Sequence, residues 1–279
     1  MPASKQENPL QPAPAFEARR PLVSVVITAY NSTELLEDTL RSACGQTWPE
    51  KEIIVVDDGS KPECAAVIAR AVEKFPGVIL AREPNRGPSG ARNRGVALTR
   101  GEYIAFLDHD DLWRDGLIAR LVAKIESDPA LGLAFCRIEH MRVGGEPTGR
   151  ISTTKLTGFS VRDMLISDPA CCGSSFIARR SAYTETGGFG EAYVRGEAPE
   201  FFIRLLLAGW KIEGIDDVLV LYRNTPGGLS AKGGKMLEDR LRILRETLPK
   251  CPKLGRGITI HIALRWTEFK NRLRKVLIG

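Results

Sequence analysis

Three short stretches of mostly β-branched and apolar residues constrain the fold of this chain more than any other feature. They cover residues 22–29, 52–57 and 103–107, each has the length of one β-strand, and each is followed at once by polar or acidic residues. Because apolar residues fill most positions rather than alternate ones, the pattern predicts strands that are buried on both faces, as in a parallel sheet.

Helical patterns separate these strands. They lie near residues 35–43, 62–75 and 88–98, and Ser32 or Thr33 is a suitable N-cap for the first helix. Strands that alternate with helices predict an α/β fold with a central, mainly parallel sheet flanked by helices. The other predicted elements are strands at 78–81, 132–138, 173–178 and 215–222, and helices at 113–126 and 200–208.

Polar residues follow three of the predicted strands directly. They are Tyr30-Asn31, Asp57-Asp58 and the acidic run Asp108–Asp111. Because ligands of parallel α/β sheets bind beyond the carboxyl ends of the strands, these residues are expected to meet at one edge of the sheet. The carboxylates of Asp108–Asp111 repel one another, and a hard cation such as Mg²⁺ or Mn²⁺ would relieve that repulsion. The alternative is a solvated acidic turn.

Two further segments admit both a functional and a structural interpretation. A carboxylate of Asp57-Asp58 could accept hydrogen bonds from a ribose hydroxyl or a base N–H, or it could complete a turn with Gly59-Ser60. The segment 85–95 combines small residues with three arginines at a predicted helix start, where phosphate could bind, or it is a surface loop with a solvated basic helix face.

Other sites are disfavoured by the residues that the chain offers. It has three histidines and no Ser-His-Asp arrangement, so a hydrolase with a histidine base is disfavoured, and its six cysteines show no zinc spacing. No apolar run approaches the roughly 18 residues of a transmembrane helix. Residues 1–20 are rich in proline and lack the apolar core of a signal peptide, which predicts a disordered tail on a cytoplasmic protein.

Charge is divided unevenly along the chain. The net charge is +6, but residues 231–279 hold 13 Lys and Arg against 4 Asp and Glu, a balance of +9, which leaves 27 basic and 30 acidic residues, or −3, in residues 1–230. The basicity is therefore a property of a C-terminal extension. No nucleic-acid-binding motif accompanies it, so a nucleic-acid partner is not expected.

The C-terminal extension is predicted to be helical over 235–247 and 258–277. In the first helix, Leu237, Leu241, Leu244 and Leu248 lie near one face. In the second, five apolar residues from Ile262 to Val276 recur at spacings of four, three, four and three, with basic residues around them. This helix either packs on the main body or in a homodimer, or docks on the inner face of a cell membrane through anionic lipids.

Taken together, the motifs occur in one order at regular spacings. Residues 25–31, 52–60, 85–93 and 103–111, followed by 187–189, 195–197, 201–204, 209–210 and 221–223, resemble the family 2 glycosyltransferases over residues 21–230. The resemblance implies the Rossmann-like glycosyltransferase A fold, with a nucleotide-binding half at 21–111 and an acceptor half at 112–230. It also implies a nucleotide-sugar donor, most often a UDP-sugar, and a saccharide or lipid-linked acceptor in polysaccharide or cell-envelope biosynthesis.

The resemblance also implies roles for particular residues. Ala29 and Tyr30 would flank the base, Asp58 or Asp57 would bond the base or ribose, and Arg86, Arg92 and Asp108 would lie near the nucleotide. Asp108 and Asp110 match the Asp-x-Asp pattern that holds Mn²⁺ or Mg²⁺ in the family, with Asp110 favoured as the metal ligand. Transfer in the family typically inverts the anomeric centre, and a carboxylate deprotonates the acceptor.

Three positions depart from the family pattern. Ala198 stands where the base aspartate of a Glu-Asp pair is expected, which leaves Glu197 or Glu200 as the base, although Glu200 could instead stabilise the first turn of its helix. Thr225 stands near a position where many relatives have a histidine, and Gly190 stands where an aspartate commonly follows Gly-Gly-Phe. The alternative function is therefore a nucleotide-sugar-binding protein with weak or lost transfer.

Overall fold

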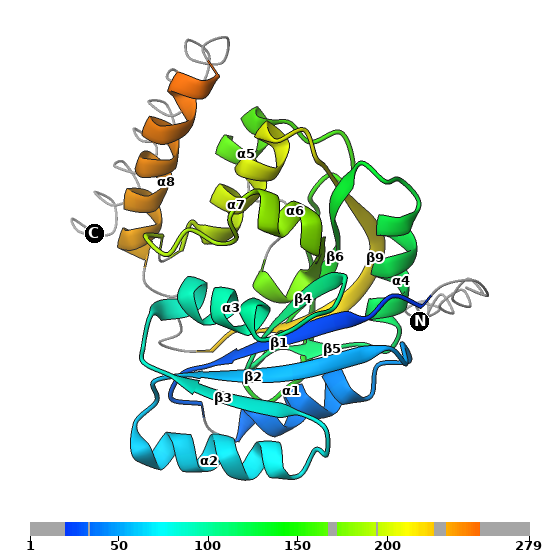
Figure 1. Cartoon of the computed structure of the whole chain (residues 1–279), viewed down its shortest axis with the longest axis vertical. Coiled ribbons are helices and arrows are strands. Elements are labelled where there is room, and N and C mark those ends of the chain that lie inside the picture. Colours follow the sequence, from blue (N-terminus) through cyan, green and yellow to red (C-terminus); the bar gives the residue numbers. More distant parts are fainter. Residues whose placement is uncertain (1–19, 33, 167–171, 194, 226–232, 252–279) are drawn as a thin grey trace, which may run out of the picture.

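The structure is a computed structural model that describes residues 20–32, 34–166, 172–193, 195–225 and 233–251 (Figure 1). The predicted N-terminal tail, apart from its last residue, and the predicted helix at 258–277 lie outside the described residues.

Four neighbouring parallel strands form the N-terminal half of the sheet, in the order β3-β2-β1-β4. Three helices connect them, as the sequence pattern predicts. The bounds are β1 Val23–Ala29, α1 Leu35–Cys44, β2 Lys51–Asp58, α2 Pro62–Glu73, β3 Ile79–Glu83, α3 Gly87–Ala97 and β4 Tyr103–Asp108.

The sheet continues beyond β4 in the order β8-β6-β9-β5, and β7 pairs with β6. Strand β8 is antiparallel to both β4 and β6, whereas β6 and β9 are parallel. The strands are β5 Leu112–Trp113, β6 Leu131–Met141, β7 Pro147–Ile151, β8 Phe176–Arg179 and β9 Lys211–Arg223. The helices are α4 Leu117–Glu126, α5 Val161–Ile166, α6 Arg180–Glu185, α7 Glu197–Leu207 and α8 Gly233–Thr247, with 3₁₀ turns at Gly173–Ser175 and Leu248–Lys250.

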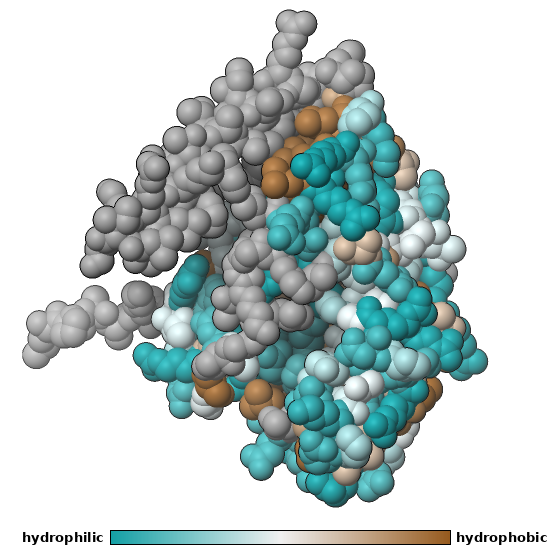
Figure 2. Space-filling model, turned by 90° about the vertical axis from the view of Figure 1, so that its left-hand side faces the viewer, coloured by the Kyte–Doolittle hydropathy of each residue, from teal (hydrophilic) through white to brown (hydrophobic). Residues whose placement is uncertain are grey.

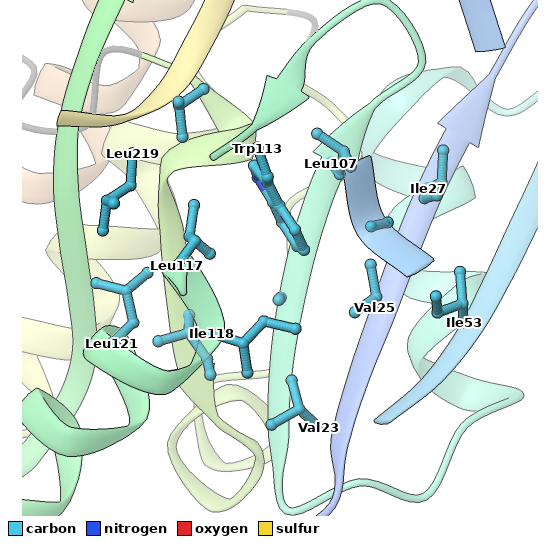
Figure 3. Packing of buried hydrophobic residues seen from close by; sticks show 14 of the residues in the cluster. Val23, Val25, Ile27, Ile53, Leu107, Trp113, Leu117, Ile118, Leu121 and Leu219 are labelled. Carbon is cyan, nitrogen blue, oxygen red and sulfur yellow. The ribbon is translucent and has the colours of Figure 1, made fainter. Parts of the chain in front are cut away.

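Two hydrophobic clusters cover the two faces of the sheet. Val23, Val25 and Ile27 of β1 belong to one cluster, together with residues of α1 and α2. Figure 3 shows how this cluster includes Leu117, Ile118 and Leu121 of α4. Val26 of β1 belongs to the other, which includes Phe106 and residues of α3, α6 and α7. All residues of β1 are buried. Since successive side chains of a strand point to opposite faces, burial on both faces accounts for the continuous apolar pattern.

Three sequence-based predictions of local structure are wrong. The helix predicted at 113–126 begins only at Leu117, because Leu112–Trp113 pairs with β9 as a short strand. The strand predicted at 173–178 begins at Phe176, after a 3₁₀ turn. Ser32 is not the N-cap of α1, whose N-cap position is Glu34, and Ser32 is instead buried. Thr33, the other candidate, lies outside the described residues.

Helix α8, the first part of the basic C-terminal extension, shares a core with the main body. Its Ile243 and Leu244 are buried in the same cluster as Phe201 and Phe202 of α7. Helix α8 is therefore part of the folded body rather than a separate appendage.

In the part of the chain that the structure describes, no helix combines the length and hydropathy needed to cross a membrane. Among the residues coloured in Figure 2, hydrophilic ones predominate and hydrophobic ones gather in a few patches.

Candidate active site

The loop after β1 is tied to the loop after β2. Ala29 is the last residue of β1 and is buried, whereas the next residue, Tyr30, is 50% exposed. The backbone N–H of Asn31 donates to Ser60 Oγ at 2.8 Å, and Asn31 Oδ1 accepts from the backbone N–H of Lys61 at 3.0 Å. Tyr30 thus lies at the carboxyl end of β1, next to a residue that is hydrogen-bonded to the loop after β2.

Asp57 and Asp58 at the end of β2 hold the neighbouring backbone. Asp57 accepts a hydrogen bond from the N–H of Ser60 at 2.9 Å, as the turn interpretation predicts. Asp58 accepts from the N–H of Arg86 at 2.8 Å, which joins β2 to the start of α3. Burial raises the pKa of Asp58, while the backbone N–H groups of Arg86 and Gly87 oppose the rise.

A small pocket lies beside these groups. Asp58 and Arg86 line it together with Glu83 and Arg94. The Arg86 guanidinium donates to Glu191 at 2.8 Å across the exposed side of the loop. The pocket therefore combines acceptor and donor groups next to the carboxyl end of β2.

The acidic run after β4 contains carboxylates with different environments. Asp111 is buried, accepts from Ser174 Oγ at 2.6 Å and from the backbone N–H of Arg223 at 2.9 Å, and so fixes the turn. Burial raises the pKa of Asp111 well above its ordinary value, and the charges of Asp108 and Asp110 raise it further. Asp111 is consequently a structural residue, whereas Asp108 and Asp110 are more accessible to solvent.

The end of β9 holds the acidic turn from the other side. Arg223 Nε donates to the carbonyl oxygen of Asp110 at 2.7 Å, and Thr225 Oγ1 donates to Asp110 Oδ2 at 2.8 Å. The threonine that departs from the family pattern thus lies directly against the carboxylate of Asp110.

Arg92 of α3 joins two carboxylates that are far apart in the sequence. Its Nη2 donates to Asp108 Oδ1 at 2.7 Å and its Nη1 donates to Glu197 Oε1 at 3.1 Å. The arginine side chain is 5% exposed, that of Glu197 is 15% exposed and that of Asp108 is 28% exposed. Gly173 leaves room for the guanidinium, because a Cβ there would lie 2.7 Å from Arg92 Nη2.

Glu197 is the first residue of α7 and is largely buried. Burial raises the pKa of the Glu197 carboxyl above its ordinary value, and the charge of Arg92 opposes that rise. In the described structure, Glu197 Oε2 and Arg92 Nε are buried without a hydrogen-bond partner. A buried carboxyl group with a spare oxygen, next to a strand-end aspartate, makes Glu197 a candidate proton acceptor.

Glu200 has a different environment, although it lies in the same helical turn. Its two carboxylate oxygens each accept from the Arg204 guanidinium at 2.6 Å. Arg204 also donates to the backbone carbonyl groups of Thr186 and Gly188. Arg204 therefore anchors α7 to the loop before it, and Glu200 holds Arg204 in place and lies outside the Arg92 network.

Asp108, Arg92 and Glu197 form one network, and Asp110 lies in the same turn as Asp108. Asp57 and Asp58 lie at the end of β2, which is separated from β4 by β1. Sequence reasoning missed Ser174, which accepts from the N–H of Asp108 at 3.0 Å and donates to Asp111. No motif marks this serine, since it lies in the irregular second half of the chain.

Asp108 and Asp110 suit a divalent cation whose remaining ligands are supplied by water and substrate. Among the described residues, no group of three or more His, Cys, Asp and Glu is placed to hold a metal ion. Asp108 and Asp110 each engage one carboxylate oxygen, Oδ1 with Arg92 and Oδ2 with Thr225. Two carboxylates suit Mg²⁺ or Mn²⁺, which usually keep positions for water and substrate phosphates.

Comparisons with known proteins identify the family and the fold of the chain. The family model of Glycosyl transferase family 2 matches residues 24–187. A Bacillus subtilis protein, TuaG, whose name proposes a glycosyltransferase of teichuronic acid biosynthesis, is 28% identical over 232 residues, which cover 81% of this chain and 88% of TuaG. The chain spans 35%, 41% and 63% of the length of three further curated relatives.

Two solved structures share the fold. The mannosyltransferase PcManGT of Pyrobaculum calidifontis, in complex with GDP-Man and Mn²⁺, has a TM-score of 0.65 and 20% identity, covering 83% of this chain and 65% of its own. TarS of S. aureus, residues 1–349, in complex with UDP-GlcNAc, also has a TM-score of 0.65 and 20% identity, covering 81% of this chain and 66% of its own.

Proposed function

Because the chain belongs to glycosyl transferase family 2, we propose that it transfers a sugar from a nucleotide-sugar donor to an acceptor hydroxyl group. The observation that carries this proposal is the network in which Arg92 links Glu197 to Asp108 at the carboxyl end of β4. It unites a candidate proton acceptor with the strand end where the donor is expected to bind.

The donor site proposed here lies across the ends of β1 and β2. Ala29 and the exposed ring of Tyr30 flank the base, and Asp58, or Asp57, accepts a hydrogen bond from the base or ribose. Arg86, at the start of α3, lies near the phosphates. A UDP-sugar is the favoured donor by family resemblance. The two similar solved structures hold GDP-Man and UDP-GlcNAc, so the base is itself a variable within the fold.

Asp108 and Asp110 are proposed to hold the divalent cation, which would neutralise the developing charge of the diphosphate leaving group. Thr225 Oγ1 fixes the Oδ2 atom of Asp110 and leaves Oδ1 for ligation. Arg92 fixes Oδ1 of Asp108 in the same way. The protein thereby orients one oxygen of each carboxylate before substrate binds.

Glu197 is proposed to be the general base of an inverting transfer. Its carboxylate takes the proton of the acceptor hydroxyl, the acceptor oxygen forms a bond to the anomeric carbon, and the bond from that carbon to the diphosphate oxygen breaks. Burial raises the pKa of Glu197, which makes the carboxylate a stronger proton acceptor. Glu200 is the less suitable base, because both of its oxygens are engaged by Arg204.

The acceptor is proposed to be a saccharide or a lipid-linked saccharide, with the protein in the cytoplasm or on the inner face of the membrane. The basic segment 258–277 is the part proposed to contact the membrane or to form a homodimer. A second candidate function, nucleotide-sugar binding without transfer, rests on Ala198 at the expected aspartate position. It is less favoured, because Glu197 supplies a buried carboxyl group one residue away.

The test is turnover of UDP- and GDP-sugars with Mn²⁺, measured as nucleotide diphosphate release and as product formed on a panel of saccharide acceptors. Donor affinity is measured by calorimetry. We expect Asp110→Ala to abolish turnover, and Glu197→Gln to lower turnover at least about 100-fold with little effect on donor affinity. Glu200→Gln is the matched control from the same helical turn.

Full turnover by Asp110→Ala would overturn the metal assignment. If Glu200→Gln loses turnover while Glu197→Gln keeps it, the assignment of the base is wrong. Metal-dependent donor binding without turnover on any acceptor would favour the second candidate function.

A further inference from the structure

A carboxylate on α8 binds the backbone immediately before Glu197. Asp239 Oδ2 accepts from the N–H of Arg195 at 2.7 Å and from the N–H of Gly196 at 3.2 Å. Asp239 is only 8% exposed, so this contact is largely shielded from solvent. The two amides belong to the turn that leads into α7, whose first residue is Glu197.

Helix α7 has no N-terminal cap from its own side chains. Gly196 occupies the N-cap position, and a glycine offers no side-chain oxygen for the exposed N–H groups of the first turn. Asp239 binds the N–H groups of Gly196 and of the residue before it, and so places a carboxylate from another helix at the helix end where a negative charge is most favourable. Glycine is needed for this approach, because a Cβ on Gly196 would lie 2.9 Å from both Asp239 Cβ and Ile243 Cδ1.

Two other residues of α8, Arg242 and Glu246, bind the chain at residues 192 and 193, shortly before this turn. Arg242 Nη1 donates to the carbonyl oxygen of Ala192 at 3.2 Å, and its guanidinium lies 5.1 Å from the ring centre of Tyr193. The Tyr193 hydroxyl bonds to the Glu246 carboxylate. One face of α8 therefore binds the segment before Glu197 through main-chain and side-chain contacts.

From this geometry we propose that Asp239 is a positioning residue for the transfer reaction: through the N–H groups of Arg195 and Gly196 it sets the place of Glu197 relative to Asp108. The inference rests on the proposed function, in which Glu197 is the base. Arg92 binds the Glu197 carboxylate from the α3 side, and Asp239 fixes the backbone that carries it. A shift of about 1 Å in a catalytic group can lower a rate about 100-fold.

The test compares Asp239→Ala with Asp239→Asn in the full chain. The asparagine keeps an oxygen that accepts from the two N–H groups, whereas alanine removes it. Glu238→Gln is the matched control, because Glu238 is an exposed carboxylate next to Asp239 on the same helix and takes no part in the contacts with residues 192–196 described above. Four quantities are measured for each: kcat, donor dissociation constant, melting temperature, and amide hydrogen exchange in residues 195–200.

We expect Asp239→Ala to lower kcat about 10- to 100-fold, to leave donor affinity within about twofold, and to speed exchange of the 195–200 amides. Asp239→Asn is expected to restore kcat to within a few-fold of the wild type, and Glu238→Gln to leave kcat within about twofold. A purely structural role of α8 would instead change all three variants in proportion to their loss of thermal stability.

Wild-type kcat in Asp239→Ala, or unchanged exchange at residues 195–200, would overturn the proposal. So would equal losses of kcat in Asp239→Asn and Asp239→Ala. If the wild-type protein turns over no donor, the proposed function fails separately. The hydrogen-exchange comparison of the two variants then still decides whether Asp239 fixes this turn.

Discussion

Replacing Arg92 with methionine is expected to expose the energetic role of the buried network. Arg92 donates to both Asp108 and Glu197, so its removal leaves two carboxylates without their common partner. Methionine is the substitution of choice, because its unbranched, apolar side chain fills most of the same space and keeps the cavity small.

The magnitude follows from burial. Removing one partner of a buried ion pair costs about 3–5 kcal/mol, because the remaining charge is left uncompensated. Glu197, at 15% exposure, carries most of this cost, while Asp108, at 28% exposure, is partly solvated. The substitution also removes Arg92 Nε, a buried N–H group without a hydrogen-bond partner, and this offsets part of the cost. We therefore expect Arg92→Met to lose about 3 kcal/mol of unfolding free energy at pH 8.

The loss is expected to depend on pH. Burial already raises the pKa of Glu197 above its ordinary value of 4.5, and Arg92 lowers it, so the substitution raises this pKa further. The folded variant then holds a proton that the unfolded chain has released, and stability falls as pH rises from about 4.5 through the folded pKa. The deficit relative to the wild type is therefore smaller at pH 5 than at pH 8.

Urea unfolding followed by circular dichroism at the two pH values measures both quantities. With a slope of about 3 kcal/mol/M, the midpoint at pH 8 should fall by about 1 M. Adding Glu197→Gln to Arg92→Met removes the buried charge and should recover at least about half of the loss. The reasoning is refuted if the deficit is equal at both pH values, or if the double variant recovers nothing.

Three further outcomes are expected. Gly95→Ala should lower the melting temperature by about 4–8 °C, because a Cβ would lie 2.3 Å from Val26 Cγ1, and an unchanged melting temperature would contradict this close packing. Phe106→Ala, at a fully buried position, should lose about 3–5 kcal/mol in urea unfolding, and a loss under about 1 kcal/mol would contradict its place in the core. As pH rises from 5 to 8, Asp111→Asn should lose less unfolding free energy than the wild type, because burial raises the pKa of Asp111 and ionisation of this carboxyl group destabilises the fold. A larger loss in the variant than in the wild type, measured by urea unfolding, would contradict this reasoning.

The parts of the fold that the sequence predicts correctly are those specified locally. The apolar run of β1 and the acidic residues that end β2 and β4 are each written within a few consecutive residues. Parallel topology then brings the strand ends together, so Asp57, Asp58 and Asp108 could be assigned to one edge of the sheet. These assignments need no information about distant contacts.

Other features depend on contacts between distant residues and leave no local signal. The strand β5 exists because Leu112 and Trp113 meet β9, although their own sequence continues a helical pattern. Arg92 meets Glu197 across 105 positions, and Asp239 meets Gly196 across 43. A carboxylate that caps another helix cannot be recognised from spacing, because the cap rules apply to residues adjacent in the chain.

The pairing of β5 with β9 also sets an order in which the molecule can form. Strands β1 to β4 lie within the first 108 residues and pair with one another, so this half can assemble early in synthesis. The acidic turn can be fixed only after Arg223 and Thr225 have been synthesised, because these residues bind Asp110 and Asp111. Contacts of such long sequence separation form late, because the entropy of closing the loop is lost first. A nascent chain therefore completes strands β1 to β4 before β9 fixes the acidic turn, so a prematurely released chain would lack the fixed turn that carries the proposed metal ligands.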